Sequence, residues 1–128
     1  MDSQSILVVD DSPIIVRKLT ALLEKLGHRV VQTATTGQEA IAAYKAIKPD
    51  VVTMDIIMPD MDGIEATKHI LAENPDAIII MITSIGQESM VSDAIIAGAK
   101  GYVLKPFQED RVNAVISKAC KKIIHHHR

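Results

Sequence analysis

Polar and charged side chains end four of the five aliphatic runs in this chain, and together they could carry out chemistry on an anionic group. The first run ends in Asp10 and Asp11, the third in Asp55, the fourth in Thr83 and the fifth in Lys105. Each residue alone is more often a helix cap, a turn residue or part of a surface ion pair. If the runs are parallel strands, however, their ends lie along one edge of the sheet, where open α/β folds bind ligands. The pattern therefore predicts one shared site.

Three neighbouring carboxylates at this edge predict a bound cation. The side chains of Asp10, Asp11 and Asp55 would repel one another, and a small cluster of carboxylate, carbonyl and water oxygens suits Mg²⁺. Lys105 beside them could offset the remaining charge or hold an anionic group, and Thr83 would add a hydroxyl donor. A metal, a nucleophilic carboxylate, a cation and a hydroxyl donor are the parts needed for phosphoryl transfer to an aspartate. That reaction is the chemistry we expect at the site.

Alternating strands and helices must position these residues. Ser12 followed by Pro13 is typical of a helix start, and Thr36 with Glu39 has the spacing of a capping box. The expected strands cover residues 6–9, 28–34, 51–55, 77–82 and 101–104, and the helices that follow them begin near residues 13, 37, 63, 88 and 108. Such alternation predicts an α/β fold, with one doubly wound (βα)5 domain whose five-stranded parallel sheet carries helices on both faces.

Composition predicts one aliphatic domain without a surface for nucleic acid or membrane lipid. Hydrophobic residues make up 48% of the 128 residues but aromatic residues only 2%, which favours helices packed on a sheet over stacking platforms for bases. The net charge of −2 and the absence of a long apolar stretch argue against binding to nucleic acid and against a membrane span. The single Cys120 cannot form an internal disulfide, which fits a reducing, cytoplasmic setting. We assign residues 1–124 to the domain and 125–128 to a His-rich tail, either native or the remnant of a tag.

Four segments resemble the receiver domain of bacterial two-component response regulators. They read VVDDS, VTMDIIMPDMDG, MITS and AGAKGYVLKPF, and the resemblance runs from Ile6 to about Ile124. The longer stretch GQESMVSDAIIAGAKGYVLKPFQEDRV is similar to stand-alone chemotaxis response regulators of the CheY type. The resemblance implies a flavodoxin-like fold. It also implies a signalling phosphoprotein, not a turnover enzyme, that assists its own phosphorylation and dephosphorylation and signals to the flagellar motor.

The resemblance assigns a role to each residue of the acidic site. Asp55 would be the phosphoacceptor that attacks the phosphohistidine of a sensor kinase. Asp11 would bind Mg²⁺ directly, Asp10 would act beside it largely through water, and the backbone carbonyl of Ile57 would complete the protein's share of the metal shell. Lys105 would pair with a phosphoryl oxygen, and the peptide bond that follows it is expected to be cis.

A conformational switch and its partners are implied in the same way. Thr83 would be the hydroxyl drawn toward the phosphoryl group, and Tyr102 the aromatic side chain that moves inward as Thr83 vacates its space. The sensor histidine kinase would approach the start of the first helix, near Ile14. A flagellar motor switch protein or another phospho-dependent protein would bind the face of the fourth helix, fifth strand and fifth helix, and a phosphatase is a further expected partner. Four lysines lie in the sequence of that region, at positions 100, 118, 121 and 122.

Two residues near the reaction centre distinguish this sequence. Ile57 and Ile85 stand two positions after Asp55 and Thr83, and neither has a polar group that could orient water. We hypothesise that the aspartyl phosphate is therefore hydrolysed more slowly than with Asn or Glu at these positions.

Other functions stay open at this stage. Within the family, the chain could be a phosphorelay intermediate or a phosphate sink. A flavodoxin-like cofactor binder is disfavoured because Asp10 and Asp11 would repel a phosphate in the absence of a metal, and because aromatic residues are scarce. A phosphatase with an aspartate nucleophile would need a second Asp two residues after Asp55. Asp60 and Asp62 are assigned to a turn and a helix N-cap, not to the metal.

Overall fold

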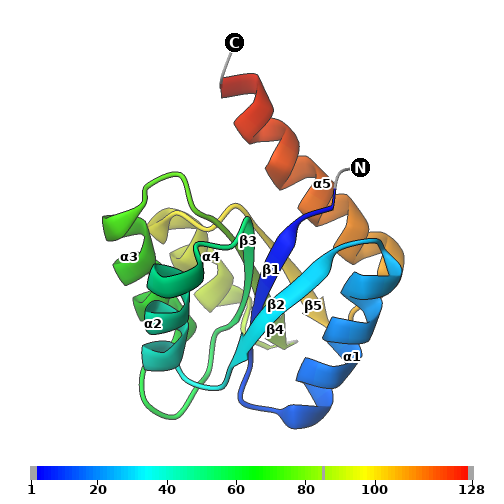
Figure 1. Cartoon of the computed structure of the whole chain (residues 1–128). Coiled ribbons are helices and arrows are strands. Elements are labelled where there is room, and N and C mark those ends of the chain that lie inside the picture. The colour runs from blue at the N-terminus through cyan, green and yellow to red at the C-terminus, as the bar shows by residue number, and fades with distance from the viewer. Residues whose placement is uncertain (1–2, 85, 127–128) are drawn as a thin grey trace.

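Five strands alternate with five helices in the computed structural model (Figure 1), which describes residues 3–84 and 86–126, the last five of these by backbone alone. The strands are β1 (Ser5–Val9), β2 (Arg29–Ala34), β3 (Val51–Asp55), β4 (Ile78–Ser84) and β5 (Gly101–Lys105). The helices are α1 (Pro13–Lys25), α2 (Gly37–Ile47), α3 (Gly63–Glu73), α4 (Glu88–Ala97) and α5 (Glu109–His126). The predicted α/β fold is confirmed.

All neighbouring strands are parallel, in the order β2-β1-β3-β4-β5. The chain order reverses between β1 and β3, which is the point at which doubly wound sheets bind ligands beyond the carboxyl ends of the strands. Asp10 follows the last residue of β1, and Asp55 is the last residue of β3. The topology therefore brings Asp10 and Asp55 to the same point of the sheet edge.

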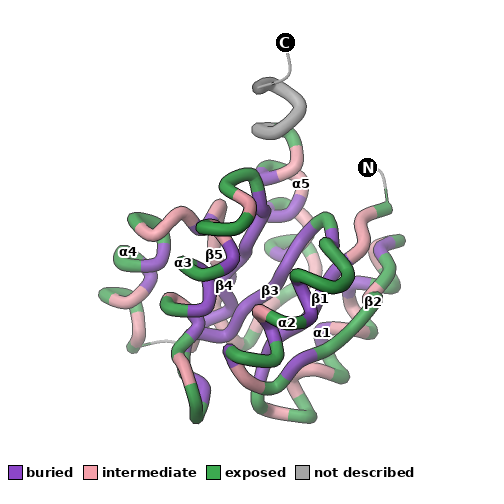
Figure 2. The backbone as a smooth tube through the Cα atoms, turned by 60° about the vertical axis from the view of Figure 1, so that its left-hand side comes forward, coloured by how far each residue is buried: buried purple, intermediate pink, exposed green. Residues whose placement is uncertain are grey.

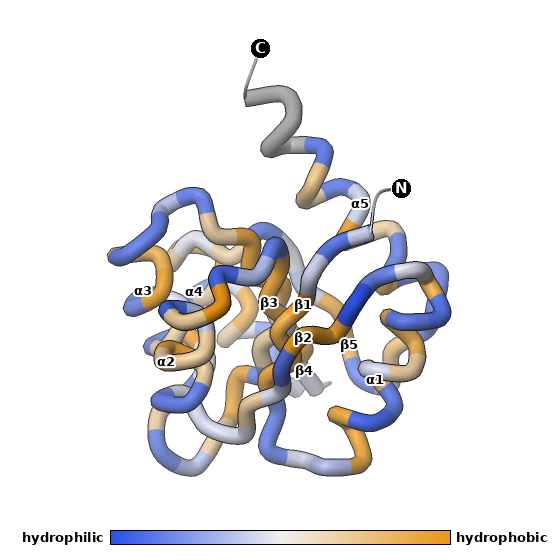
Figure 3. The backbone as a smooth tube through the Cα atoms, viewed as in Figure 1, coloured by the Kyte–Doolittle hydropathy of each residue, from blue (hydrophilic) through white to orange (hydrophobic). Residues whose placement is uncertain are grey.

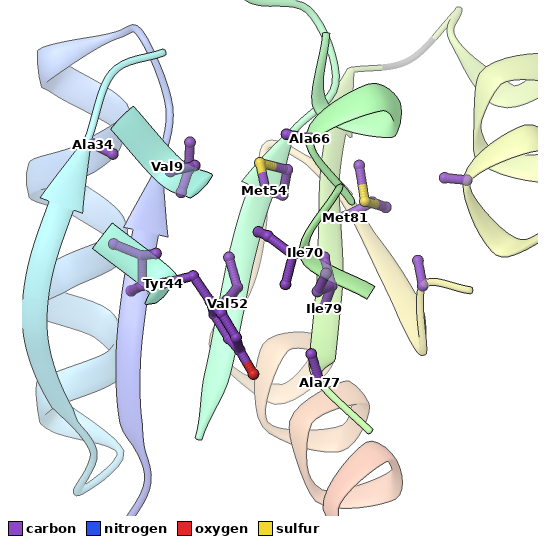
Figure 4. Close-up of a cluster of buried hydrophobic side chains, with 14 of the residues drawn as sticks. Val9, Ala34, Tyr44, Val52, Met54, Ala66, Ile70, Ala77, Ile79 and Met81 are labelled. Carbon is purple, nitrogen blue, oxygen red and sulfur yellow. The ribbon is translucent and has the colours of Figure 1, made fainter. Parts of the chain in front are cut away.

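Each face of the sheet has its own hydrophobic core. Side chains alternate between the faces along a strand, and one set packs under α2, α3 and α4, as the labelled residues Val52, Met54, Ile79 and Met81 illustrate (Figure 4). The other set, which includes Ile80, packs under α1 and α5. Buried residues run along β1, β3 and β4 in Figure 2, and Figure 3 shows that the middle of the sheet is strongly hydrophobic. Burial on both faces explains the continuous aliphatic runs in β3 and β4.

The start of α2 differs from the predicted capping box. The hydroxyl of Thr36 accepts the backbone N–H of Glu39 at 3.1 Å, as predicted. The Glu39 carboxylate, however, accepts the backbone N–H of Thr35 at 2.9 Å and the Thr35 hydroxyl at 3.1 Å. Two donors on Thr35 replace the single backbone donor of a standard box, so the reciprocal bond lies one residue earlier than predicted.

Helix α5 presents one apolar side to the sheet. The helical spacing in the sequence predicts that Val112, Val115, Ile116, Ala119 and Ile123 face inward. The first four are buried, and the side chain of Ile123 lies outside the described residues. The same spacing predicts that Lys118, Lys121 and Lys122 face outward. Lys118 and Lys121 are exposed, whereas the side chains of Lys122 and of the tail at 125–128 lie outside the described residues. Among the helices that the structure describes, none has both the length and the apolar character needed to cross a bilayer.

Candidate functional site

The three predicted aspartates converge at the carboxyl edge of the sheet. Asp10, Asp11 and Asp55 each offer a carboxylate oxygen, and these oxygens all lie within 4.8 Å of one another. Asp10 and Asp55 are buried, with 2% and 6% of their surface exposed, while Asp11 faces solvent. The cluster is therefore open to solvent on the side of Asp11.

Lys105 reaches the cluster from the end of β5. Its Nζ lies 3.0 Å from Oδ2 of Asp10 and 3.4 Å from Oδ1 of Asp55, with only 17% of the lysine side chain exposed. The Lys105–Pro106 peptide bond is cis, which confirms that prediction. One ammonium group thus contacts two of the three clustered carboxylates, and the site carries an excess of negative charge.

Burial and charge set the protonation of the site. Burial, and then the charge of Asp10, raise the pKa of Asp55 from 3.8 to about 6, although Lys105 opposes the shift. Burial alone lowers the pKa of Lys105, but its bonds and charge interactions with Asp10 and Asp55 outweigh this, so its pKa is raised. Lys105 is therefore a permanent cation, and Asp55 is an ionised carboxylate near neutral pH.

The oxygen atoms of the site fit a small hard cation. One oxygen of Asp10 is held by the Ser12 backbone N–H at 2.9 Å. The other, Oδ2, is buried and lies 3.0 Å from the Lys105 ammonium, but among the described residues it accepts no geometrically regular hydrogen bond. Carboxylates with room for water on the exposed side of Asp11 are the ligands that Mg²⁺ prefers. The donor set is consistent with the predicted magnesium site.

The hydroxyl of Thr83 does not contact the carboxylates in this structure. Thr83 is fully buried, and its Oγ1 donates to Oε1 of Gln87 at 2.9 Å. The same oxygen of Gln87 accepts the backbone N–H of Ser84 at 3.2 Å. Thr83 therefore stands beside the predicted site with its single proton engaged elsewhere. The sequence does not predict this role of Gln87, because it indicates only that a helix begins near residue 88.

Tyr102 lies on the same side of the sheet as Thr83. Tyr102 pairs with Met81 in the ladder between β4 and β5, and Thr83 follows Met81 by two residues, so the two side chains share a face. The Tyr102 ring is partly exposed, and the guanidinium carbon of Arg111 lies 5.7 Å from its centre. In this structure the ring is thus turned toward α5.

Gly63 lies directly behind Asp55 and was also missed. Its backbone N–H donates to the carbonyl of Ile56 at 2.6 Å. A Cβ at position 63 would overlap the backbone carbonyl oxygen of Asp55 and would lie 2.9 Å from both its carbonyl carbon and Cγ of Met54. Only glycine therefore permits α3 to begin this close to the end of β3.

Replacing Gly63 with alanine is expected to lower the free energy of unfolding by about 1–3 kcal/mol, the usual effect of overpacking, and to displace the backbone of Asp55. A displacement of this kind can slow a reaction by up to about 100-fold, so phosphorylation from a small phosphodonor should slow markedly. Gly37→Ala is the matched control, because Gly37 also begins a helix and a Cβ there lies 2.9 Å from Cβ of Met61. A Gly63→Ala protein that reacts as fast as Gly37→Ala would contradict this positioning role.

Asp60 lies in a bend of the chain, where a turn is predicted, and it also bonds to the start of α2. Its two carboxylate oxygens accept the backbone N–H groups of Gly37 and Gln38, each at 3.0 Å. These bonds, first the one from Gln38, lower the pKa of Asp60. Asp60 thereby ties the loop after β3 to the start of α2. Asp62 is the N-cap of α3, as predicted, and accepts the N–H of Glu65 at 2.8 Å.

Comparison with known proteins agrees with this geometry. The family model for the response regulator receiver domain matches residues 6–117. The chemotaxis protein CheY of Thermotoga maritima is 46% identical over 116 residues, which cover 91% of this chain and 97% of that protein. The chemotaxis protein CheY of Bacillus subtilis is 50% identical over 113 residues, which cover 88% of this chain and 94% of that protein.

The fold has a solved counterpart of the same kind. The crystal structure of the CheX–CheY–BeF₃–Mg²⁺ complex from Borrelia burgdorferi matches with a TM-score of 0.85 and 37% sequence identity, and it covers 89% of this chain and 87% of that chain. CheY is itself a standard example of the strand order found here. These findings favour a role in chemotaxis over the phosphorelay, phosphate-sink and flavodoxin alternatives. The chain belongs to the response regulator receiver domain family, as a chemotaxis response regulator of two-component signalling.

Proposed function

We propose that Asp55 accepts a phosphoryl group from a sensor histidine kinase and that its phosphorylation switches a protein-binding face. The arrangement around Asp55 supports this most strongly. Its carboxylate is buried beside Asp10 and Asp11 and has the Lys105 ammonium 3.4 Å away. Carboxylates gathered in this way raise the energy of the folded protein, so stability does not explain them. Their arrangement is explained if Asp55 is a nucleophile whose site binds a cation and an anionic substrate.

Phosphoryl transfer assigns a task to each group. An oxygen of Asp55 attacks phosphorus while the phosphorus–nitrogen bond to the donor histidine breaks, and the bonding electrons return to the imidazole. The ammonium of Lys105 offsets the charge of one phosphoryl oxygen. Mg²⁺, held by Asp11 and Asp55 with Asp10 acting largely through water and the carbonyl of Ile57 completing the set, would neutralise further negative charge on the phosphoryl group. The product is an acyl phosphate on Asp55.

The switch would connect this site to the face formed by α4, β5 and α5. There Thr83 would turn toward the phosphoryl group, and Tyr102 would move inward. A groove on this face is lined in part by Ile95, Lys100 and Tyr102, and 44% of the Ile95 surface is exposed. An apolar floor with basic residues suits a flagellar motor switch protein, or another phospho-dependent partner, that offers an acidic and apolar segment.

Further partners and the cellular setting belong to the same proposal. The histidine kinase would dock near Ile14, which is 57% exposed at the start of α1. A phosphatase would end the signal, and the crystal structure of CheX with CheY, BeF₃ and Mg²⁺ shows a relative bound to a second protein. We place the signalling unit at residues 1–124 and in the cytoplasm, where ATP charges the kinase. The protein would act as a signalling phosphoprotein that assists its own phosphorylation and dephosphorylation.

Transfer from a kinase tests this proposal. A chemotaxis histidine kinase is autophosphorylated with radiolabelled ATP, freed of nucleotide and mixed with this protein. The label should move to the wild-type chain when Mg²⁺ is present. It should stay on the kinase when a chelator removes Mg²⁺ or when Asp55→Asn replaces the wild type. Equal labelling of the Asp55→Asn protein would overturn the assignment of the phosphoacceptor.

Replacing Ile57 with asparagine is expected to shorten the lifetime of the aspartyl phosphate. Ile57 stands two residues after Asp55, is 47% exposed and has no side-chain group that could form a hydrogen bond. An amide there could orient an attacking water, and one such bond corresponds to a roughly 2- to 10-fold faster hydrolysis. The loss of phosphate from purified phosphoprotein measures the rate, and Ile95→Asn on α4 is the exposed control. An unchanged rate would contradict the hypothesis. Ile85, the second residue of the hypothesis on hydrolysis, lies outside the described residues.

A further inference from the structure

The side chain of Gln87 connects the Thr83 hydroxyl to the turn that begins α4. Gln87 is the N-cap residue of α4, but its side chain does not cap that helix. Oε1 of Gln87 instead points back to the end of β4, where it accepts the Thr83 hydroxyl at 2.9 Å and the Ser84 backbone N–H at 3.2 Å. The Gln87 backbone N–H donates to the Ser84 carbonyl at 3.2 Å, so the contact closes a tight turn.

The two bonds determine which way the Gln87 amide faces. A backbone N–H is only a donor, so the atom that faces Ser84 must be the carbonyl oxygen of the side chain and not its nitrogen. That oxygen is only an acceptor, so Thr83 must be the donor in the second bond. A threonine hydroxyl has a single proton. While Thr83 donates to Gln87 it has no proton to donate to anything else.

We infer that Gln87 is a positioning residue that holds Thr83 in the unphosphorylated arrangement and so opposes phosphorylation. The inference rests on the proposed function, in which Thr83 donates its proton to a phosphoryl oxygen on Asp55. The bond to Gln87 and the bond to the phosphoryl group exclude each other because they use the same proton. Each molecule that switches must therefore break the contact with Gln87.

Release of this contact also gives the switch a direct connection to α4. After Thr83 leaves, Oε1 of Gln87 retains only the Ser84 N–H, and one of the two bonds between the start of α4 and the end of β4 through this side chain is lost. Ile95, further along α4, belongs to the proposed partner face. Breaking the Gln87 contact would thus couple phosphorylation to the position of α4, through a shift in population between the states with and without the Thr83–Gln87 bond.

Two substitutions of Gln87 separate the role of its oxygen from its role in packing. Gln87→Met keeps the length of the side chain and removes the acceptor, whereas Gln87→Glu keeps an acceptor oxygen. BeF₃ with Mg²⁺ serves as the probe, because it mimics a phosphoryl group on an aspartate. Gln87→Met should bind BeF₃ roughly 2- to 10-fold more tightly than the wild type and react faster with acetyl phosphate by a similar factor, as loss of one hydrogen bond in the resting state implies. Gln87→Glu should show no such gain.

A double-mutant cycle with Thr83→Val decides the mechanism. Valine has the shape of threonine but no proton to donate, so Gln87→Met should have no effect in that background. A gain that persists with Thr83→Val, or affinities of the wild type and Gln87→Met that agree within twofold, would overturn the inference while the proposed function stands. A wild-type chain that takes up no BeF₃ at Asp55 would overturn the proposed function and this inference together.

Discussion

Replacing Lys105 with methionine is expected to lower the free energy of unfolding at pH 7 by about 2–3 kcal/mol, because removal of one partner leaves buried carboxylates without a counter-charge. The loss should fall below the range for a fully enclosed pair, since Lys105 keeps 17% of its side chain exposed. The pKa of Asp55, already raised to about 6, should rise further without the ammonium that opposes the shift. Urea unfolding in a chelator measures the change.

The same substitution should slow phosphorylation of Asp55 by about 100-fold, in line with removal of one charged donor from a transition state. Lys68→Met is the matched control, because Lys68 is exposed on α3 and an exposed lysine contributes little to stability. If Lys105→Met were as stable and as reactive as Lys68→Met, the ammonium would have no part in the site.

The opposite effect on stability is expected for Asp55→Asn. The pKa of Asp55 is raised from 3.8 to about 6, first by burial and then by Asp10, so the ionised form weakens the fold. A shift of about two units corresponds to about 3 kcal/mol. The shift already includes the opposing effect of Lys105. Because solvent on the side of Asp11 screens the charges of the site, we expect a smaller net gain of about 1–2 kcal/mol at pH 7 in a chelator. Asp93→Asn, an exposed change on α4, is the control.

This gain should depend on pH with a definite sign. A carboxyl group whose pKa is raised by folding favours the folded state below its unfolded pKa and loses that contribution as pH rises through its folded pKa. The advantage of Asp55→Asn should therefore be small below pH 3.8 and complete above about pH 6. Added Mg²⁺ should stabilise the wild type more than the variant, because it binds the folded carboxylates. A variant less stable than the wild type without metal would contradict the electrostatic account.

Much of the site could be predicted because the topology determines it. Asp10, Asp11, Asp55 and Lys105 each lie at or just after the end of a strand, and parallel strands bring those ends together whatever their distance along the chain. The structure adds that Lys105 is still part of the sheet, paired with Ser84, although the predicted strand stopped before it. Ladder bonds therefore hold the lysine in place.

The missed residues act through local geometry that no pattern of residue types reveals. Gln87 matters because one side-chain oxygen reaches back across a turn to Thr83. Gly63 matters because α3 begins against the backbone of Asp55, and Asp60 because a loop meets the start of α2. A glycine after a helix cap and an aspartate in a turn are both common for ordinary reasons. Their specific roles appear only once the tertiary contacts are known.

The central claim is that Asp55 accepts the phosphoryl group. The most direct measurement is to incubate the protein with acetyl phosphate and Mg²⁺, record its intact mass and locate the modification by fragmentation. We predict a mass increase of one phosphoryl group, carried by Asp55, which is absent when a chelator replaces Mg²⁺. A chain that stays unmodified with Mg²⁺ present, or that carries the group on another residue, would contradict the claim.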